Sequence, residues 1–182
     1  MGERRAPDGL ALIEELINTL DVEAGRDSLA RPDELAALSR RAGAPLTAAD
    51  VPGLRRLREA LRAVCLAHAG HRPLPPDRAE VLAGLFADAP LVLHLDGVTG
   101  ATELRPAPGA RPGLPAFTAR VAAVVATAEA NGTWRRLKAC EAETCHWAYY
   151  DHSPAGRRRW CSMQTCGARA KMRAYRAKRQ AE

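Results

Sequence analysis

The sequence contains few aromatic residues and no long apolar segment. Phe, Trp and Tyr make up only 4% of its 182 residues. No apolar run approaches the roughly 20 residues that a membrane-spanning helix requires, and the N-terminus lacks the basic start and apolar core of a signal peptide. We therefore expect a cytoplasmic protein without a membrane partner.

Acidic residues are scarce in the last part of the chain. Residues 134–182 contain 12 Lys or Arg and 4 Asp or Glu, which gives a net charge of +8. Residues 1–133 contain 15 Lys or Arg and 17 Asp or Glu, which gives a net charge of −2. A polyanion would bind such a segment, because contact with phosphates releases counterions and an anionic lipid surface offers the same attraction. The charge distribution therefore predicts a polyanionic partner for this segment.

Cysteine is also sparse, but four of the five cysteines lie close together in the sequence. They follow the pattern C-x4-C-x15-C-x4-C, which is two short-spaced pairs. In a reducing compartment such pairs are typical of metal ligands rather than disulfides, and zinc prefers four sulfur ligands in closed structural sites. A filled shell leaves no position for a catalytic water, which argues against zinc-dependent hydrolysis. The predicted ligands of one Zn²⁺ ion are Cys140, Cys145, Cys161 and Cys166.

Two alternatives for these thiols stay open. His146 or His152 could supply a ligand in place of a cysteine, and the four cysteines could be ordinary thiols. The C-terminal segment has little apolar core of its own, so that bound metal would supply the missing folding free energy. Cys65 differs from the other four, because it lies on the apolar stripe of a predicted helix and is expected to be buried.

The N-terminal part of the chain, up to about Ala130, carries apolar side chains mostly at helical spacing. Thr47 and Asp50 have the spacing of a capping box in front of the strongest apolar stripe, and Gly43 is a predicted helix end. Residues 91–95 and 101–105 flank turn residues and predict a hairpin. Helices are predicted over residues 8–24, 32–43, 47–69, 75–87 and 117–131, with a loop over residues 105–115.

The C-terminal segment alternates between strand, turn and helix signals. Residues 147–151 predict a short strand, and a turn at residues 153–156 precedes three consecutive arginines that adjoin Cys161. Residues 162–179 predict a helix with a basic face suited to the major groove of DNA. Its small apolar face, expected to pack on the zinc module, comprises Met163, Cys166, Ala170, Ala174 and Ala177. The candidate DNA-contacting residues are Arg157, Arg158, Arg159, Arg169, Lys171, Arg173 and Arg176.

These residues resemble the CGNR zinc-finger proteins, whose N-terminal portion is the ABATE domain. The resemblance covers Arg136-Leu137-Lys138-x-Cys140, Cys145-x-Trp147, Tyr150-Asp151-x-Ser153, Arg158-Arg159-Trp160-Cys161-Ser162-Met163 and Cys166-Gly167-x-Arg169-x-Lys171. The chain has Ala168 where the family name implies Asn, which puts sequence-specific recognition in question. Weaker similarity extends to residues 16–19 and 57–61. The resemblance implies a stress-responsive bacterial transcription regulator with a sensing or dimerising domain in front of a DNA-binding finger.

The predicted fold is mainly α with a small β-hairpin (α+β). Residues 1–132 are expected to form a helical sensor or oligomerisation domain, and residues 133–182 a small treble-clef-like zinc module that ends in a basic helix. Asn18 and His94 are candidates for a pocket that binds a small-molecule effector. A homodimer is a further expectation, because the N-terminal domain could serve oligomerisation.

We expect a non-enzymatic bacterial transcription regulator that binds double-stranded DNA through a zinc finger. One alternative is an interaction module that binds nucleic acid or protein without sequence preference and with steep salt dependence. The other is an enzyme with an active site in the N-terminal domain, using His94 or the pair Asn18 and Thr19. Against the enzyme, the sequence has no nucleophile elbow or phosphate-binding loop in this region.

Overall fold

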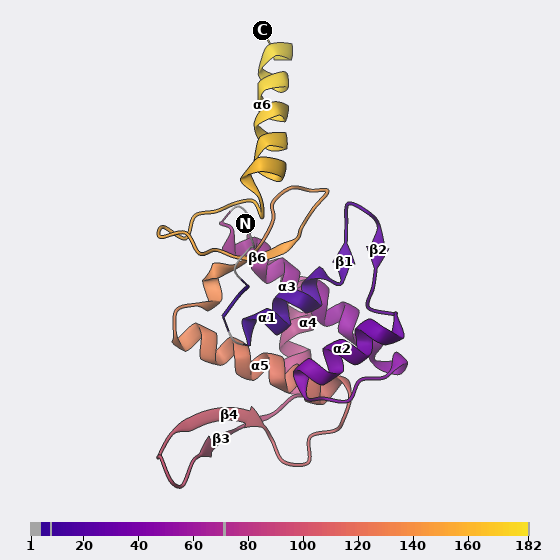
Figure 1. Ribbon diagram of the computed structural model, residues 1–182, viewed down its shortest axis with the longest axis vertical. Helices are drawn as coiled ribbons and strands as arrows, with labels where there is room; N and C mark the ends of the chain where they lie inside the picture. The colour runs from indigo at the N-terminus through magenta and orange to yellow at the C-terminus, as the bar shows by residue number, and fades with distance from the viewer. Residues whose placement is uncertain (1–4, 8, 71, 182) are drawn as a thin grey trace.

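The computed structural model describes residues 5–7, 9–70 and 72–181, and helices dominate this part of the chain (Figure 1). The helices are α1 (Leu10–Asn18), α2 (Pro32–Ala42), α3 (Val51–His68), α4 (Pro76–Ala87), α5 (Leu114–Ala130) and α6 (Ala168–Ala181). Antiparallel hairpins pair β1 (Leu20–Asp21) with β2 (Arg26–Asp27), β3 (Leu91–Leu95) with β4 (Thr102–Pro106), and β5 (Leu137–Ala139) with β6 (Ala148–Tyr150). The predicted α+β class is confirmed.

The helix boundaries follow the capping residues. Helix α2 begins at Pro32 and is capped after Ala42 by Gly43, whose φ of 62° is a left-handed conformation that glycine adopts without strain. Asp50 lies just before α3, and its carboxylate accepts the backbone N–H of Thr47 at 2.8 Å and that of Leu114 at 2.9 Å. The second contact joins the start of α5 to the start of α3.

The first predicted helix is shorter than expected. Its predicted first residue, Asp8, lies outside the described residues, and α1 ends at Asn18 instead of continuing to Ala24. A hairpin replaces the last predicted turns because Leu20 pairs with Asp27, and a turn around Gly25, with φ of 63°, reverses the chain. The apolar Leu20 suited a helix as well as a strand, so that spacing alone did not separate them.

Helix α3 lies at the centre of the apolar core and contacts α1, α4, α5 and β5. Leu54, Leu57 and Leu61 of α3 are fully buried, as is Phe117 of α5. The β5–β6 hairpin belongs to the same core, because Leu137, Ala139 and Ala148 are also fully buried. The segment that carries the cysteines is therefore packed directly on the N-terminal helices.

Two elements extend from opposite ends of the molecule (Figure 1). The β3–β4 hairpin lies below α5, and α6 rises from the other end as a single straight helix. The predicted packing of Ala174 and Ala177 on the zinc module is wrong, since residues 171–180 are all exposed. Among the described residues, no other element runs alongside α6 to cover its small apolar face. None of the described helices combines the length and the apolar character needed to cross a membrane.

Candidate metal centre and basic helix

The four clustered cysteines converge in space. Their Sγ atoms all lie within 4.8 Å of one another. The Sγ of Cys161 is 3.7 Å from that of Cys145 and 3.8 Å from that of Cys166. Cys140 and Cys166 are buried, whereas Cys145 and Cys161 are partly exposed. This spacing allows all four sulfurs to contact one ion.

Backbone hydrogen bonds form the first loop of the cluster. Strand β5 ends just before Cys140, whose N–H donates to the carbonyl of Trp147 at 2.9 Å. The N–H of Cys145 donates to the carbonyl of Ala142 at 2.8 Å, which closes a tight turn. His146 follows with a φ of 51°, so the chain reverses directly after the second thiol. The short loop thereby aims both sulfurs at the same point.

The second pair of cysteines lies at the base of α6. A wide π-helical turn, Met163–Gly167, carries Cys166 into the cluster, and the Ser162 hydroxyl caps it by accepting the N–H of Thr165 at 3.2 Å. Gly167 allows close packing at this turn, because a Cβ atom there would lie 3.0 Å from Sδ of Met163. The metal site and the start of α6 are therefore one structural unit.

The electrostatics of the cluster fit a bound cation. Hydrogen bonds from Cys145 and Cys161 lower the pKa of Cys140. Hydrogen bonding to Cys140 raises the pKa of Cys145 and of Cys161, and burial raises that of Cys166. Four thiolates at this separation require a compensating positive charge, which a divalent ion such as zinc supplies. The cluster contains cysteines alone; neither His146 nor His152 belongs to it.

A buried ion pair holds the loop between the two cysteine pairs. The Lys138 ammonium lies 3.0 Å from the Asp151 carboxylate and donates to the carbonyl of Gly156 at 2.6 Å. Asp151 also accepts the N–H of Ser153 at 3.0 Å and that of Arg158 at 2.9 Å. These contacts fix the position from which the arginine run starts.

The three predicted DNA-contacting arginines of the loop differ in their surroundings. Arg157 is exposed. The Arg158 guanidinium turns inward, where it donates to the carbonyl of Cys161 at 2.5 Å and lies 5.2 Å from the ring centre of Tyr149. Arg159 is exposed but pairs with Glu141 at 2.7 Å. All three were predicted to contact DNA, but Arg158 is already engaged in holding the loop.

The candidate residues on α6 are exposed, but Arg169 already has a protein partner. Its guanidinium lies 2.7 Å from the carboxylate of Glu23, in the turn of the β1–β2 hairpin. Lys171, Arg173 and Arg176 are exposed to solvent. The helix contains six basic residues and no acidic one. The basic face expected from the sequence is therefore accessible beyond its first turn.

Asn18 joins the N-terminal helices to the cysteine segment. Its amide donates to the carbonyl of Ala148 at 3.0 Å and accepts the N–H of Ala148 at 2.7 Å. The Asn18 amide thus bonds both backbone groups of one residue, as the backbone of a neighbouring strand does. Arg62, which is buried, donates to the carbonyl of Ile17 at 2.8 Å and to that of His146 at 2.7 Å. Sequence reasoning assigned no role to Arg62 and placed Asn18 in a ligand pocket.

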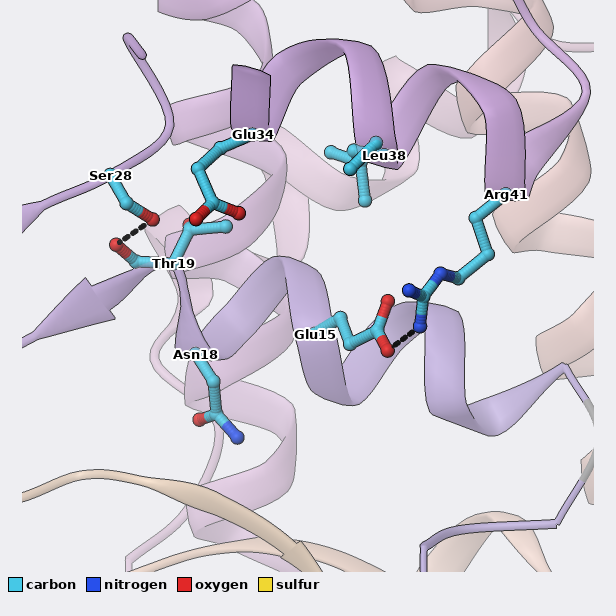
Figure 2. Close-up of a pocket in the computed structure, with 8 residues that line it drawn as sticks. Glu15, Asn18, Thr19, Ser28, Glu34, Leu38 and Arg41 are labelled. Atoms are coloured by element: carbon cyan, nitrogen blue, oxygen red, sulfur yellow. Dashed lines mark hydrogen bonds and ion pairs between the residues drawn. The ribbon is translucent and has the colours of Figure 1, made fainter.

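Asn18 also borders a cavity between α1 and α2, but His94 does not join it. The cavity has a volume of about 340 Å³ and is lined by residues that include Glu15, Thr19, Ser28, Glu34 and Arg41. Figure 2 shows Glu15 paired with Arg41 across the cavity, and the Asn18 amide directed away from both. His94 is half-buried in β3 opposite Glu103, so the two predicted pocket residues lie on separate elements.

Comparison with known families agrees with this organisation. Residues 10–139 match the ABATE family, described as "Putative stress-induced transcription regulator", and residues 136–179 match the CGNR zinc finger. The chain matches no curated protein. The two family matches meet in β5, the strand that packs on α3 and leads to Cys140. Because the first match spans most of the chain, the protein belongs to the ABATE family and ends in a CGNR zinc finger.

Proposed function

We propose that the protein is a bacterial transcription regulator that binds double-stranded DNA through its zinc finger. The observation that carries the proposal is the helix α6, which projects from the four-cysteine cluster with six basic residues and no acidic one. A helix of 14 residues is about 21 Å long, at about 1.5 Å per residue, and fits into the major groove. The family description of a stress-induced transcription regulator supports the same role.

In this proposal zinc has a structural function and Cys140, Cys145, Cys161 and Cys166 hold it. A bound zinc ion neutralises the clustered thiolates and fixes both loops. Cys166 and the turn that Ser162 caps join this site to α6 and thereby set the direction of the helix. Restraining the base of the helix lowers the conformational entropy that the basic side chains lose when they contact DNA.

Elemental analysis of two cysteine variants tests the metal site. Cys161→Ser should lose most of its zinc, because one of the four converging sulfurs is removed. Cys65→Ala is the matched control, since Cys65 is buried in α3 outside the cluster and should leave one zinc per chain. Full zinc occupancy in Cys161→Ser, together with an unchanged fold, would reject the assignment.

Titration of the full-length protein with duplex DNA across a range of salt concentrations tests DNA binding. Log affinity should fall linearly with log salt if Lys and Arg side chains displace counterions from phosphates. Chelation of the metal should abolish binding, because the base of α6 is no longer held. A flat salt dependence would rule out phosphate-driven binding. Competition with random duplexes then separates a sequence-specific regulator from an interaction module without sequence preference.

We further propose that the cavity between α1 and α2 binds a small polar effector. Thr19 and Ser28 line it and flank the β1–β2 hairpin, whose turn carries Glu23 against Arg169 of α6. A ligand that shifts this hairpin would therefore alter a contact of the basic helix. Small polar metabolites that bind the cavity should raise the thermal midpoint of the wild type, and Leu38→Trp, which should fill the cavity, should abolish this shift. The proposed role is regulatory and not enzymatic.

A further inference from the structure

The β3–β4 hairpin has a large apolar surface that the rest of the chain leaves uncovered. On β3, Leu93 is 67% exposed and Leu95 is 62% exposed. The hairpin has no third strand in the part of the chain that the structure describes. Although β4 packs against α5, an exposed apolar patch on β3 favours a partner.

The free edge of the hairpin belongs to β3. Strand β4 lies nearer to α5, and β3 lies on the outer side (Figure 1). The bonds from Asp96 N–H to the Ala101 carbonyl and from Ala107 N–H to the Pro90 carbonyl fix the hydrogen-bonding register. Because inward and outward residues alternate in an antiparallel pair, the N–H and C=O groups of Leu91, Leu93 and Leu95 point away from β4.

The two strands differ in the features that normally prevent edge pairing. Strand β4 contains Glu103, Arg105 and Pro106, and charged residues and proline discourage the addition of another strand. Strand β3 reads Leu-Val-Leu-His-Leu and carries no Lys, Arg, Asp, Glu or Pro. An edge of this kind favours pairing with another extended chain.

The sequence of β3 is complementary to itself. If two copies pair antiparallel about a twofold axis at Leu93, then Leu91 of each faces Leu95 of the other and the two Leu93 side chains meet. All three leucines lie on one face, because side chains alternate along a strand. The pairing sets no like charges against each other, and a twofold contact closes without leaving a further β3 edge.

We propose that β3 is the homodimer interface, and that two copies of the chain form a four-stranded antiparallel sheet centred on Leu93. The hairpin lies at the end of the molecule opposite α6, so the pairing leaves the zinc finger accessible (Figure 1). This proposal does not depend on the proposed DNA binding, so that an experiment that rejects one of the two proposals leaves the other standing.

Sedimentation velocity of the zinc-loaded full-length protein tests this interface. The wild type should show a concentration-dependent dimer, and Leu93→Lys and Leu93→Glu should each raise the dimer dissociation constant about 100-fold or more, because two leucines lose their burial and like charges meet. An equal mixture of the two variants should form a heterodimer, since residue 93 of one copy faces residue 93 of the other.

Val98→Lys is the matched control. Val98 is more exposed than Leu93 but lies in the turn outside β3, so that its substitution should leave the dimer unchanged. Zinc content and thermal melting verify that each variant is folded. A wild type that is monomeric at every concentration overturns the proposal. So does an equal effect of Val98→Lys, or a mixture of the two Leu93 variants that stays monomeric.

Discussion

Asp151 is completely buried, and its carboxylate accepts hydrogen bonds from Lys138, from Ser153 and from the N–H of Arg158. Burial opposes ionisation, but these hydrogen bonds together lower the pKa of Asp151 to about 2. A carboxylate with a depressed pKa stabilises the fold at pH values above its unfolded pKa, about 4. This contribution is lost as the pH falls from about 4 towards 2.

Asp151→Asn should destabilise the protein by about 3–5 kcal/mol, because it leaves the buried Lys138 ammonium without its counter-charge. Chemical denaturation at neutral pH with saturating zinc measures this loss. The double variant Asp151→Asn, Lys138→Met removes the unpaired charge and should recover part of the stability. If the single variant unfolds at the same denaturant concentration as the wild type, the ion pair has no structural role.

Some site residues could be predicted from the sequence because their spacing reflects their chemistry. The paired cysteines are an example, since two short loops suffice to bring four sulfurs together. Arg62 and Asn18 have no comparable local pattern, because each bonds to backbone groups that are distant in the sequence. Another buried arginine of α3, Arg58, did leave a signal, because it falls at about 20° from Cys65 on the apolar stripe and a charge there needs a buried partner. It pairs with Asp27 at 2.8 Å.

At the scale of single elements, two neighbouring arginines of the loop between the cysteine pairs are expected to have different roles. Arg157→Ala should leave the thermal midpoint unchanged and should reduce the salt slope of DNA binding by about 1, because Arg157 is exposed and available to a phosphate. Arg158→Ala should instead cost about 2 kcal/mol of stability, because it removes the hydrogen bond to Cys161. Calorimetry and DNA titration of both variants compare the two roles, and equal losses of stability would contradict the distinction.

The β1–β2 hairpin provides a second test at this scale. The Glu23 carboxylate forms an ion pair with the Arg169 guanidinium at 2.7 Å. It therefore adds a negative charge beside the proposed DNA-binding helix. Glu23→Gln should therefore raise DNA affinity by about twofold to fivefold at low salt, an effect of the size expected for an exposed ion pair. Fluorescence anisotropy measures it, with Glu80→Gln on α4 as a control, because Glu80 is exposed and lies outside both the hairpin and the cavity. If both variants bind DNA like the wild type, the contact does not restrain Arg169.

The elements that sequence predicted best are those with explicit end signals. Pro32 and Gly43 fixed α2, and the prolines before α4 fixed its start. The end of α1 was missed because Leu20 fits both helical spacing and a two-residue strand. The exposure of α6 was missed for another reason: its alanines form a small apolar face, but only tertiary structure determines whether a second element covers that face.

At the scale of the whole molecule, charge and core have different boundaries. The basic charge begins near residue 134, whereas the apolar core continues through β5 and β6. Asn18 and Arg62 add hydrogen bonds between the N-terminal helices and the first cysteine loop. The predicted domain boundary at residue 132 rests on the change in net charge and on the end of a helix. Neither feature indicates how the β5–β6 hairpin packs on the N-terminal helices.

This packing predicts that the protein unfolds as one cooperative unit and that metal binding stabilises all of it. Calorimetry of the zinc-loaded protein should give a single transition, and chelation should shift the whole transition to a lower temperature, because zinc binds the folded state. Helicity and the near-ultraviolet signal of Trp134, which is buried beside α3, should change together. The alternative is two independent domains on either side of residue 132. In that case the chelated protein would keep a helical transition at the original temperature, and the shared core would not couple the zinc finger to the ABATE helices.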